Sequence, residues 1–145
     1  MSRMIFVNLP VVDLTRSKAF YEALGFINEP RFTDETAACM RLSETIYVML
    51  LTHPKWRTFT SRPIPTTDSS EVMLALNCES REEVDRLTDL AERNGGLSDV
   101  NPIQDHGFMF SRSYSDLDGH VWEVLWMDPA VASGEAEVPP VESAA

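Results

Sequence analysis

The stretch DHGFMFSRSYSDLDGHVWEVLWMD, residues 105–128, predicts two strands joined by a tight turn. Residues 108–115 and 120–127 are short runs rich in aromatic and apolar side chains, which is typical of strands. The dipeptide Asp118-Gly119 between them favours a hairpin turn. Successive side chains of a strand point to opposite faces, so one face of the second strand carries Val121, Glu123 and Leu125 and the other carries Trp122, Val124 and Trp126.

A strand and a helix precede this hairpin. Residues 71–78 (EVMLALNC) predict a strand, and Ser80 followed by Glu83 is the capping-box pattern of a helix start. The run Asn94-Gly95-Gly96 is expected to end this helix, and a further strand is predicted near residues 97–103. The second half of the chain therefore has the order β-α-β-β-β.

The first half follows the same order. Residues 5–10 predict a strand, Asp13 is the expected N-cap of a helix that runs to about Leu24, and Gly25 is its expected stop. Three short strands are predicted near residues 27–33, 37–42 and 45–52. We therefore predict an α+β fold in which two βαβββ modules, about 4–52 and 71–127, form a curved mixed sheet around a concave pocket, because pockets favour such interfaces.

Residues 53–70 (HPKWRTFTSRPIPTTDSS) link the two modules, and this is long for a connection within one domain. The linker carries the cations Lys55, Arg57 and Arg62 beside Trp56 and Phe59. Two interpretations stay open: a pocket edge that attracts an anionic ligand, or a solvated connection whose aromatic rings pack on the sheet. Residues 129–145 are rich in Ala, Pro and Glu and predict a flexible acidic tail.

Composition narrows the classes of function. The chain has 145 residues, enough for one domain, and a formal net charge of −11 with no dominant basic patch, which argues against nucleic-acid binding. No apolar run is long enough to span a membrane, and the start has no signal-peptide pattern, so we expect a cytoplasmic protein. Cys39 and Cys78 lie in apolar runs and are interpreted as reduced core thiols. Phosphate-loop, nucleophile-elbow and dinucleotide fingerprints are absent, so no nucleotide cofactor is expected.

Three segments together resemble the glyoxalase/bleomycin-resistance/dioxygenase, or vicinal-oxygen-chelate, superfamily. They are NLPVVDLTRSKAFYEALGF (8–26), SREEVDRLTDLAERNGG (80–96) and residues 105–128, which are similar to the family's opening, its second helix and its closing "DPDGH-x-WE" hairpin. The last segment is most similar to a glyoxalase-like branch that ends in "GFMY-x-R-S-F-x-D-x-DGH-x-WE". The resemblance implies one domain over residues 1–128, a divalent metal in many members, and a homodimer.

The metal site implied by the resemblance transfers only in part. The final glutamate of the closing hairpin matches Glu123, but the histidine positions of the two first strands match Phe6 and a place near Met73, and neither of these binds a metal. Asn8 and Glu71 lie two residues away from these positions on the same strand faces. We therefore expect Asn8 to orient a substrate, and Glu71 and Glu123 to act as catalytic groups. Two close carboxylates would either bind a divalent cation or share a proton, so Glu71 and Glu123 are also the candidate metal ligands.

Three further side chains are candidate substrate-binding residues. His106 precedes a strand and has the chemistry of a general acid or base. Arg112 and Tyr114 share a strand face and suit an anionic or oxygen-rich ligand, although a paired surface arginine is an equal alternative. His120, next to the turn glycine, is interpreted as stabilising the hairpin.

Two functions stay open. One is a glyoxalase-like enzyme that performs metal-assisted lyase, isomerase or dioxygenase chemistry on an oxygen-bearing metabolite. The alternative is a non-catalytic protein that binds a small molecule or drug, as bleomycin-resistance proteins do, and the phenylalanine at position 6 favours this alternative.

Overall fold

A computed structural model describes residues 2–140 of the chain. The first module forms a four-stranded sheet of order β1-β4-β3-β2, in which β1 and β4 run parallel. Its elements are β1 (Ile5–Val11), α1 (Leu14–Ala23), β2 (Ile27–Asn28), the 3-10 helix η1 (Pro30–Phe32), β3 (Ala37–Arg41) and β4 (Ile46–Thr52).

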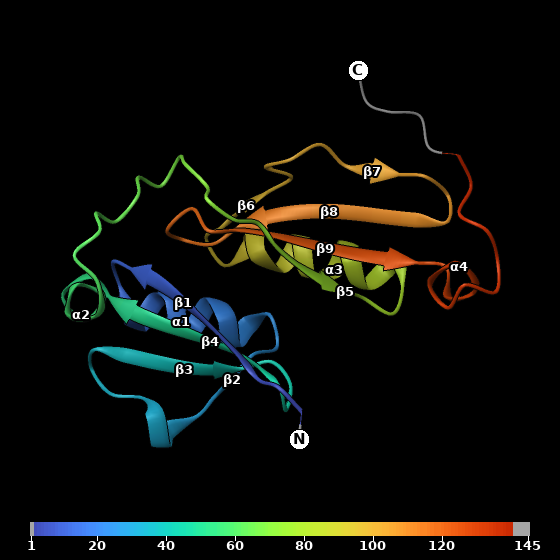
Figure 1. Ribbon diagram of the computed structural model, residues 1–145. Coiled ribbons are helices and arrows are strands. Elements are labelled where there is room, and N and C mark those ends of the chain that lie inside the picture. The colour runs from blue at the N-terminus through green and yellow to red at the C-terminus, as the bar shows by residue number, and fades with distance from the viewer. Residues whose placement is uncertain (1, 141–145) are drawn as a thin grey trace.

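The second module repeats this plan. Its strands follow the order β5-β9-β8-β6, with β5 and β9 parallel and the short β7 paired to β8. Its elements are β5 (Leu74–Asn77), α3 (Arg81–Arg93), β6 (Leu97–Ser98), β7 (Gln104–Asp105), β8 (Met109–Ser115) and β9 (Val121–Met127). The α+β fold with two βαβββ modules is confirmed, and Figure 1 shows the two sheets side by side.

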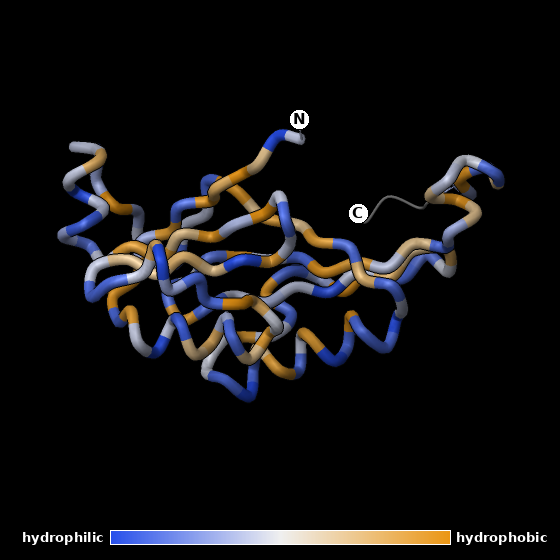
Figure 2. Tube along the Cα trace, turned by 90° about the horizontal axis from the view of Figure 1, so that it is seen from below, coloured by the Kyte–Doolittle hydropathy of each residue, from blue (hydrophilic) through white to orange (hydrophobic). Residues whose placement is uncertain are grey.

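Both long helices cover the same side of the two sheets and leave the other side open (Figure 2). The helix-facing side chains make one continuous core, which includes Leu50 and Val48 of β4 and Trp122 and Val124 of β9. The alternation predicted for residues 121–126 is confirmed, because Trp122 and Val124 are buried against the helices. The open faces of both sheets are therefore the places where polar or ligand-binding side chains can stand.

The helix ends lie where their capping residues predict. The Asp13 carboxylate accepts a hydrogen bond from the backbone N–H of Arg16 at 3.0 Å, and Ser80 Oγ accepts one from that of Glu83 at 3.1 Å. Gly25 follows α1 with φ of +99°, a left-handed conformation that a side chain would strain. These local hydrogen bonds explain why the sequence alone located both helices.

Several predicted strands are longer than the observed ones. The strand predicted at 27–33 ends at Asn28, because Pro30 starts η1, and the strand predicted at 97–103 ends at Ser98, before Asp99 takes a positive φ of 53°. The linker contains a helix that we did not predict, α2 (His53–Phe59), whose N-cap is Thr52. In the predicted tail, residues Pro129–Ala132 form the short helix α4, and residues 141–145 lie outside the described part.

Candidate functional site

A cavity of about 660 Å³ lies where the two modules meet, beneath the linker. Its floor comes from Leu9 and Pro10 at the end of β1 and from Val121 at the start of β9. The segment that leads into β5 provides a second wall with Glu71 and Val72. Most of this surface is apolar with a few polar groups, which is typical of a small-molecule site.

The linker forms the outer wall of the cavity. Helix α2 packs on β4 and β1, and Trp56 and Thr60 contribute to the lining. Beyond α2, Pro63 and Pro65 also line the cavity, and a proline fixes its own φ and limits the residue before it. The linker is thus a shaped cover, so the interpretation that placed it at a pocket edge describes its position better than a purely solvated connection does.

The cover is fastened to the second module at the β8–β9 turn. Gly119 has φ of +85°, and a Cβ atom added there would lie 2.1 Å from the carbonyl oxygen of Thr67. Only a glycine lets the linker backbone approach the turn this closely. The Asp118-Gly119 pair therefore forms the predicted hairpin turn, and Gly119 is also the position on which the linker backbone packs at Thr67.

The same turn joins the two modules by hydrogen bonds. The Asp118 carboxylate accepts from the backbone N–H of Val12 at 2.9 Å and from the Ser17 hydroxyl at 3.3 Å. The Nε2 atom of His120 lies 2.7 Å from the carbonyl oxygen of Pro10. His120 was expected to stabilise the hairpin, and it in fact bridges the hairpin to β1 while also lining the cavity.

A buried chain of polar groups lies behind this contact. Tyr21 of α1 donates a hydrogen bond to the Asp116 carboxyl at 2.6 Å and accepts one from the indole N–H of Trp122 at 3.0 Å. Burial raises the pKa of Asp116 above its usual range, and burial together with the nearby Asp116 raises the pKa of Tyr21 well above its usual value. The side-chain polar atoms of Tyr21, Asp116 and Trp122 all have hydrogen-bond partners, so this network fixes how the two modules meet.

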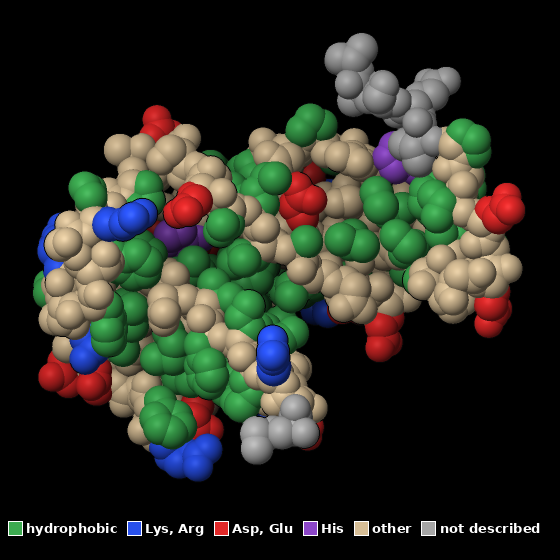
Figure 3. Space-filling view, in the orientation of Figure 1, with side chains coloured by type: hydrophobic (Ala, Val, Ile, Leu, Met, Phe, Trp, Pro, Cys, Tyr) green, Lys and Arg blue, Asp and Glu red, His purple; other side chains and the backbone are tan. Residues whose placement is uncertain are grey.

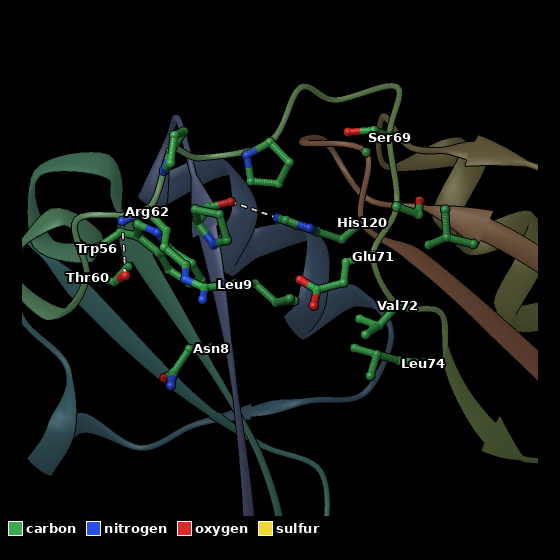
Figure 4. Close-up of a pocket in the computed structure, with 16 residues that line it drawn as sticks. Asn8, Leu9, Trp56, Thr60, Arg62, Ser69, Glu71, Val72, Leu74 and His120 are labelled. Atoms are coloured by element: carbon green, nitrogen blue, oxygen red, sulfur yellow. Dashed lines mark hydrogen bonds between the residues drawn. The ribbon is translucent and has the colours of Figure 1, made fainter.

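Two side chains of opposite charge line the cavity. Arg62 comes from the linker, and Glu71 comes from the segment before β5, on the opposite wall (Figure 4). Figure 4 also shows the Glu71 carboxylate pointing into the hollow. Within residues 2–140 neither side chain forms an ion pair. Both charges are therefore free to meet a ligand.

The wall contributed by α2 holds an unused hydrogen-bond donor. The indole nitrogen of Trp56 is buried and has no acceptor within the described part of the chain. A buried donor without an acceptor is costly, on the order of 1–3 kcal/mol. Trp56 thus carries a donor that no described residue satisfies.

The structure brings together two of the three residues expected to form a polar cluster. Asn8 and Glu71 both line the cavity, whereas Glu123 does not belong to its lining. Glu123 lies on the open face of β9, opposite Ser113 of β8, and accepts a hydrogen bond from the side-chain amide of Asn101 at 3.1 Å. Its carboxylate is thus engaged in holding the segment after β6.

The other predicted binding residues lie away from the cavity. His106 is near the far end of β8, where its ring stacks on Phe108. Tyr114 is buried in the core. Arg112 shares the helix-facing side of β8 and forms ion pairs with Asp85, Asp89 and Asp99. Its contacts with Asp99 and then Asp85 raise the pKa of its guanidinium. Arg112 thus has the paired arrangement that was its alternative interpretation.

The described residues do not fit a resident metal ion. Across residues 2–140, no three His, Cys, Asp or Glu side chains gather closely enough to hold one. The two first-strand positions that would supply histidines are Phe6 and Met73, both half exposed on the open side. We therefore derive no chemistry through a metal at this site.

Sequence reasoning left the role of the linker open and missed that of the turn. Trp56 and Arg62 were named for a possible pocket edge but not as site residues, and His120 was interpreted only as a hairpin residue. One signal was available: Thr52-His53-Pro54 is an N-cap followed by proline near the helix start, which predicts α2 and so places Trp56 against the sheet. No local pattern predicts that Thr67 packs on Gly119, because that contact is tertiary.

Comparison with known proteins fits this architecture. Residues 3–43 match the family model described as bleomycin resistance protein-like N-terminal. The hypothetical protein SA1046 from S. aureus superposes with a TM-score of 0.73 at 28% identity, over 87% of this chain and 95% of that one. The chain therefore shares the fold of the glyoxalase/bleomycin resistance/dioxygenase family structures.

Other superfamily structures are more distant in sequence. A glyoxalase/bleomycin resistance protein/dioxygenase family enzyme from Burkholderia phytofirmans matches with a TM-score of 0.72 at 14% identity, over 87% of this chain and 99% of that one. The fosfomycin resistance protein FosX from Listeria monocytogenes matches with a TM-score of 0.63 at 18% identity, over 87% and 93%. No match was found among proteins of curated function. These likenesses show the superfamily fold, which supports many chemistries.

Proposed function

We propose that this protein binds a small organic molecule in the cavity between its modules, with the linker as the cover. The observation that supports this most directly is a cavity of about 660 Å³ with a mainly apolar lining, within the size range of sites for drug-sized ligands. The prolines of the cover and its contact at Gly119 mean that little chain entropy is lost on binding. The fosfomycin and bleomycin resistance names among its structural and family matches are consistent with such a ligand.

Ligand screening by thermal shift tests this proposal, because a ligand that binds only the folded state stabilises it by mass action. At a concentration 100-fold above its Kd, a ligand should add about 2.7 kcal/mol to the free energy of unfolding. The decisive variant is Val72→Trp, which fills the cavity from an exposed wall position. Its matched control is Ile27→Trp, at a similarly exposed apolar position outside the cavity lining.

Two results are distinguishable in this experiment. The proposal expects that Val72→Trp abolishes the shift caused by each hit while Ile27→Trp leaves it unchanged. Hits that shift both variants equally would mean that ligands bind elsewhere, and the proposal would then be wrong.

A second candidate is acid–base catalysis in the same cavity, of the glyoxalase-like lyase or isomerase kind. The observation that favours it is Glu71, whose carboxylate points into an apolar hollow that is also lined by His120. Mass spectrometry of each bound ligand after incubation separates the two candidates. A ligand recovered unchanged supports binding alone, and conversion that Glu71→Gln abolishes supports catalysis.

We also propose a homodimer that pairs the open sheet faces. Large apolar side chains stand half exposed there, including Phe6 and Met73, and Figure 3 shows hydrophobic side chains gathered across this side. Exposed apolar patches of this kind mark contact surfaces. Analytical ultracentrifugation tests the prediction, and Phe6→Glu should shift a dimer toward the monomer.

No helix described within residues 2–140 has the length and apolar character needed to cross a membrane.

A further inference from the structure

We infer that the cavity selects a dipolar ligand, a small molecule with an anionic group at one end, a cationic group at the other and an apolar body between them. This inference deepens the proposed binding function and rests on it. It concerns the chemical class of the ligand, which the apolar lining alone does not specify.

The two ends of the ligand are set by two walls of the cavity. Arg62 stands on the cover, where its backbone N–H donates to the Thr60 hydroxyl at 3.2 Å, and Glu71 stands on the opposite wall. Both line the same hollow, yet they form no ion pair with each other or with any other described residue. A ligand that carries both charges can therefore meet a counter-charge on each wall.

The middle of the ligand is set by the floor. Leu9, Pro10 and Val121 also line the hollow and offer no side-chain polar group. The ring of Trp56 adds a flat apolar surface on the cover side. A rigid hydrocarbon or aromatic body therefore fits between the two charged ends better than a polar chain does.

Molecules with a single charge fit the cavity less well. The whole chain carries a formal net charge of −11, so a simple anion approaches against the field of the protein and gains only Arg62. A simple cation is favoured by that field and gains Glu71, but it makes no use of Arg62. A dipolar molecule is neutral overall and gives each charged side chain a counter-charge.

Isothermal titration with matched probes tests the inference. The dipolar probes are 4′-(aminomethyl)biphenyl-4-carboxylate and the shorter 4-(aminomethyl)benzoate, which cover two charge separations. The comparison probes for the longer compound are biphenyl-4-carboxylate, 4-(aminomethyl)biphenyl and the neutral biphenyl-4-methanol. Because Arg62 and Glu71 are exposed, each charged contact should lower Kd by about two- to fivefold, and the gain should shrink in high salt.

Single variants separate the two ends. Arg62→Gln should remove the advantage of probes that carry a carboxylate, and Glu71→Gln that of probes that carry an ammonium group. The double variant Arg62→Glu with Glu71→Arg should keep the preference for a dipolar probe, which then binds in the reverse direction. Lys18→Gln, at a partly exposed α1 position outside the cavity lining, is the control and should change no Kd.

Equal affinity for the dipolar, singly charged and neutral probes would overturn the inference while leaving the proposed binding function intact. The same holds if neither dipolar probe binds and the hits blocked by Val72→Trp are uncharged. If no compound of any class gives a shift that Val72→Trp removes, the proposed function itself fails. The two failures are therefore distinguishable.

Discussion

Replacing Tyr21 with phenylalanine should weaken the contact between the two modules without changing the shape of the core. The phenol hydroxyl donates to Asp116 at 2.6 Å and accepts from the Trp122 indole at 3.0 Å. Tyr21 and Trp122 are both almost completely buried, so water cannot replace either hydrogen bond. Tyr21→Phe therefore leaves a buried carboxyl with one donor fewer and a buried indole N–H with no acceptor.

The cost follows from these two losses. A hydrogen bond to a buried ionisable group and an unsatisfied buried donor together cost about 3 kcal/mol of the free energy of unfolding. For a chain of this length, that corresponds to a fall of about 9 °C in Tm. Urea and thermal unfolding followed by circular dichroism measure both quantities.

Tyr47→Phe is the matched control, because Tyr47 stands on the open side of β4 and stacks on Phe6. It should change the free energy of unfolding by less than about 0.5 kcal/mol. If Tyr21→Phe and Tyr47→Phe cost the same, the buried network does not hold the modules together, and this part of the reasoning is refuted.

Three further predictions concern the turn, the buried carboxyl and the thiols. Gly107→Ala, at φ of +80° with open space around it, should lower the free energy of unfolding by about 1 kcal/mol. Gly119→Ala, at φ of +85°, would place its Cβ 2.1 Å from the Thr67 carbonyl oxygen, so it should lower that free energy by roughly 3 kcal/mol and weaken ligand binding. Equal losses in urea unfolding would contradict the close contact. Because burial raises the pKa of Asp116, the folded state holds this proton more tightly than the unfolded chain, so the stabilisation is complete below pH of about 4 and is lost as pH rises through the folded-state pKa. The urea midpoint of the wild type should accordingly fall relative to that of Asp116→Asn from acid toward neutral pH. A relative rise would show that the pKa of Asp116 is lowered rather than raised in the folded state. Burial raises the pKa of Cys78 to about 11 and raises that of Cys39, so both thiols should react with a disulfide reagent at pH 8 only after unfolding, and rapid labelling of the native protein would contradict their burial.

The sequence predicted most of the fold because the decisive signals are local. Asp13, Ser80 and Gly25 mark helix ends through hydrogen bonds or backbone angles that involve only nearby residues. The face of β9 that carries Glu123 followed from strand alternation alone. Strand lengths were less predictable: β2 ends at Asn28 because Pro30 starts η1, and β6 ends at Ser98 before Asp99 takes a positive φ.

The candidate site was predicted only in part, because it depends on contacts between distant segments. Asn8 and Glu71 were predicted to share a polar cluster by counting along two strand patterns, and both line the cavity, while their roles stay predictions. Arg112 was assigned to the right strand, but strand alternation does not say which face meets the helices, and Asp85 and Asp99 occupy its guanidinium. Arg62 belongs to the site only because the linker folds back over the turn at Gly119.

A crystal structure of the protein with the strongest ligand from the thermal-shift screen tests the central claim most directly. The account predicts ligand density above Leu9 and Val121, covered by the linker, with its charged ends toward Arg62 and Glu71. Density at any other place, with the hollow beneath the linker filled only by water, would contradict it.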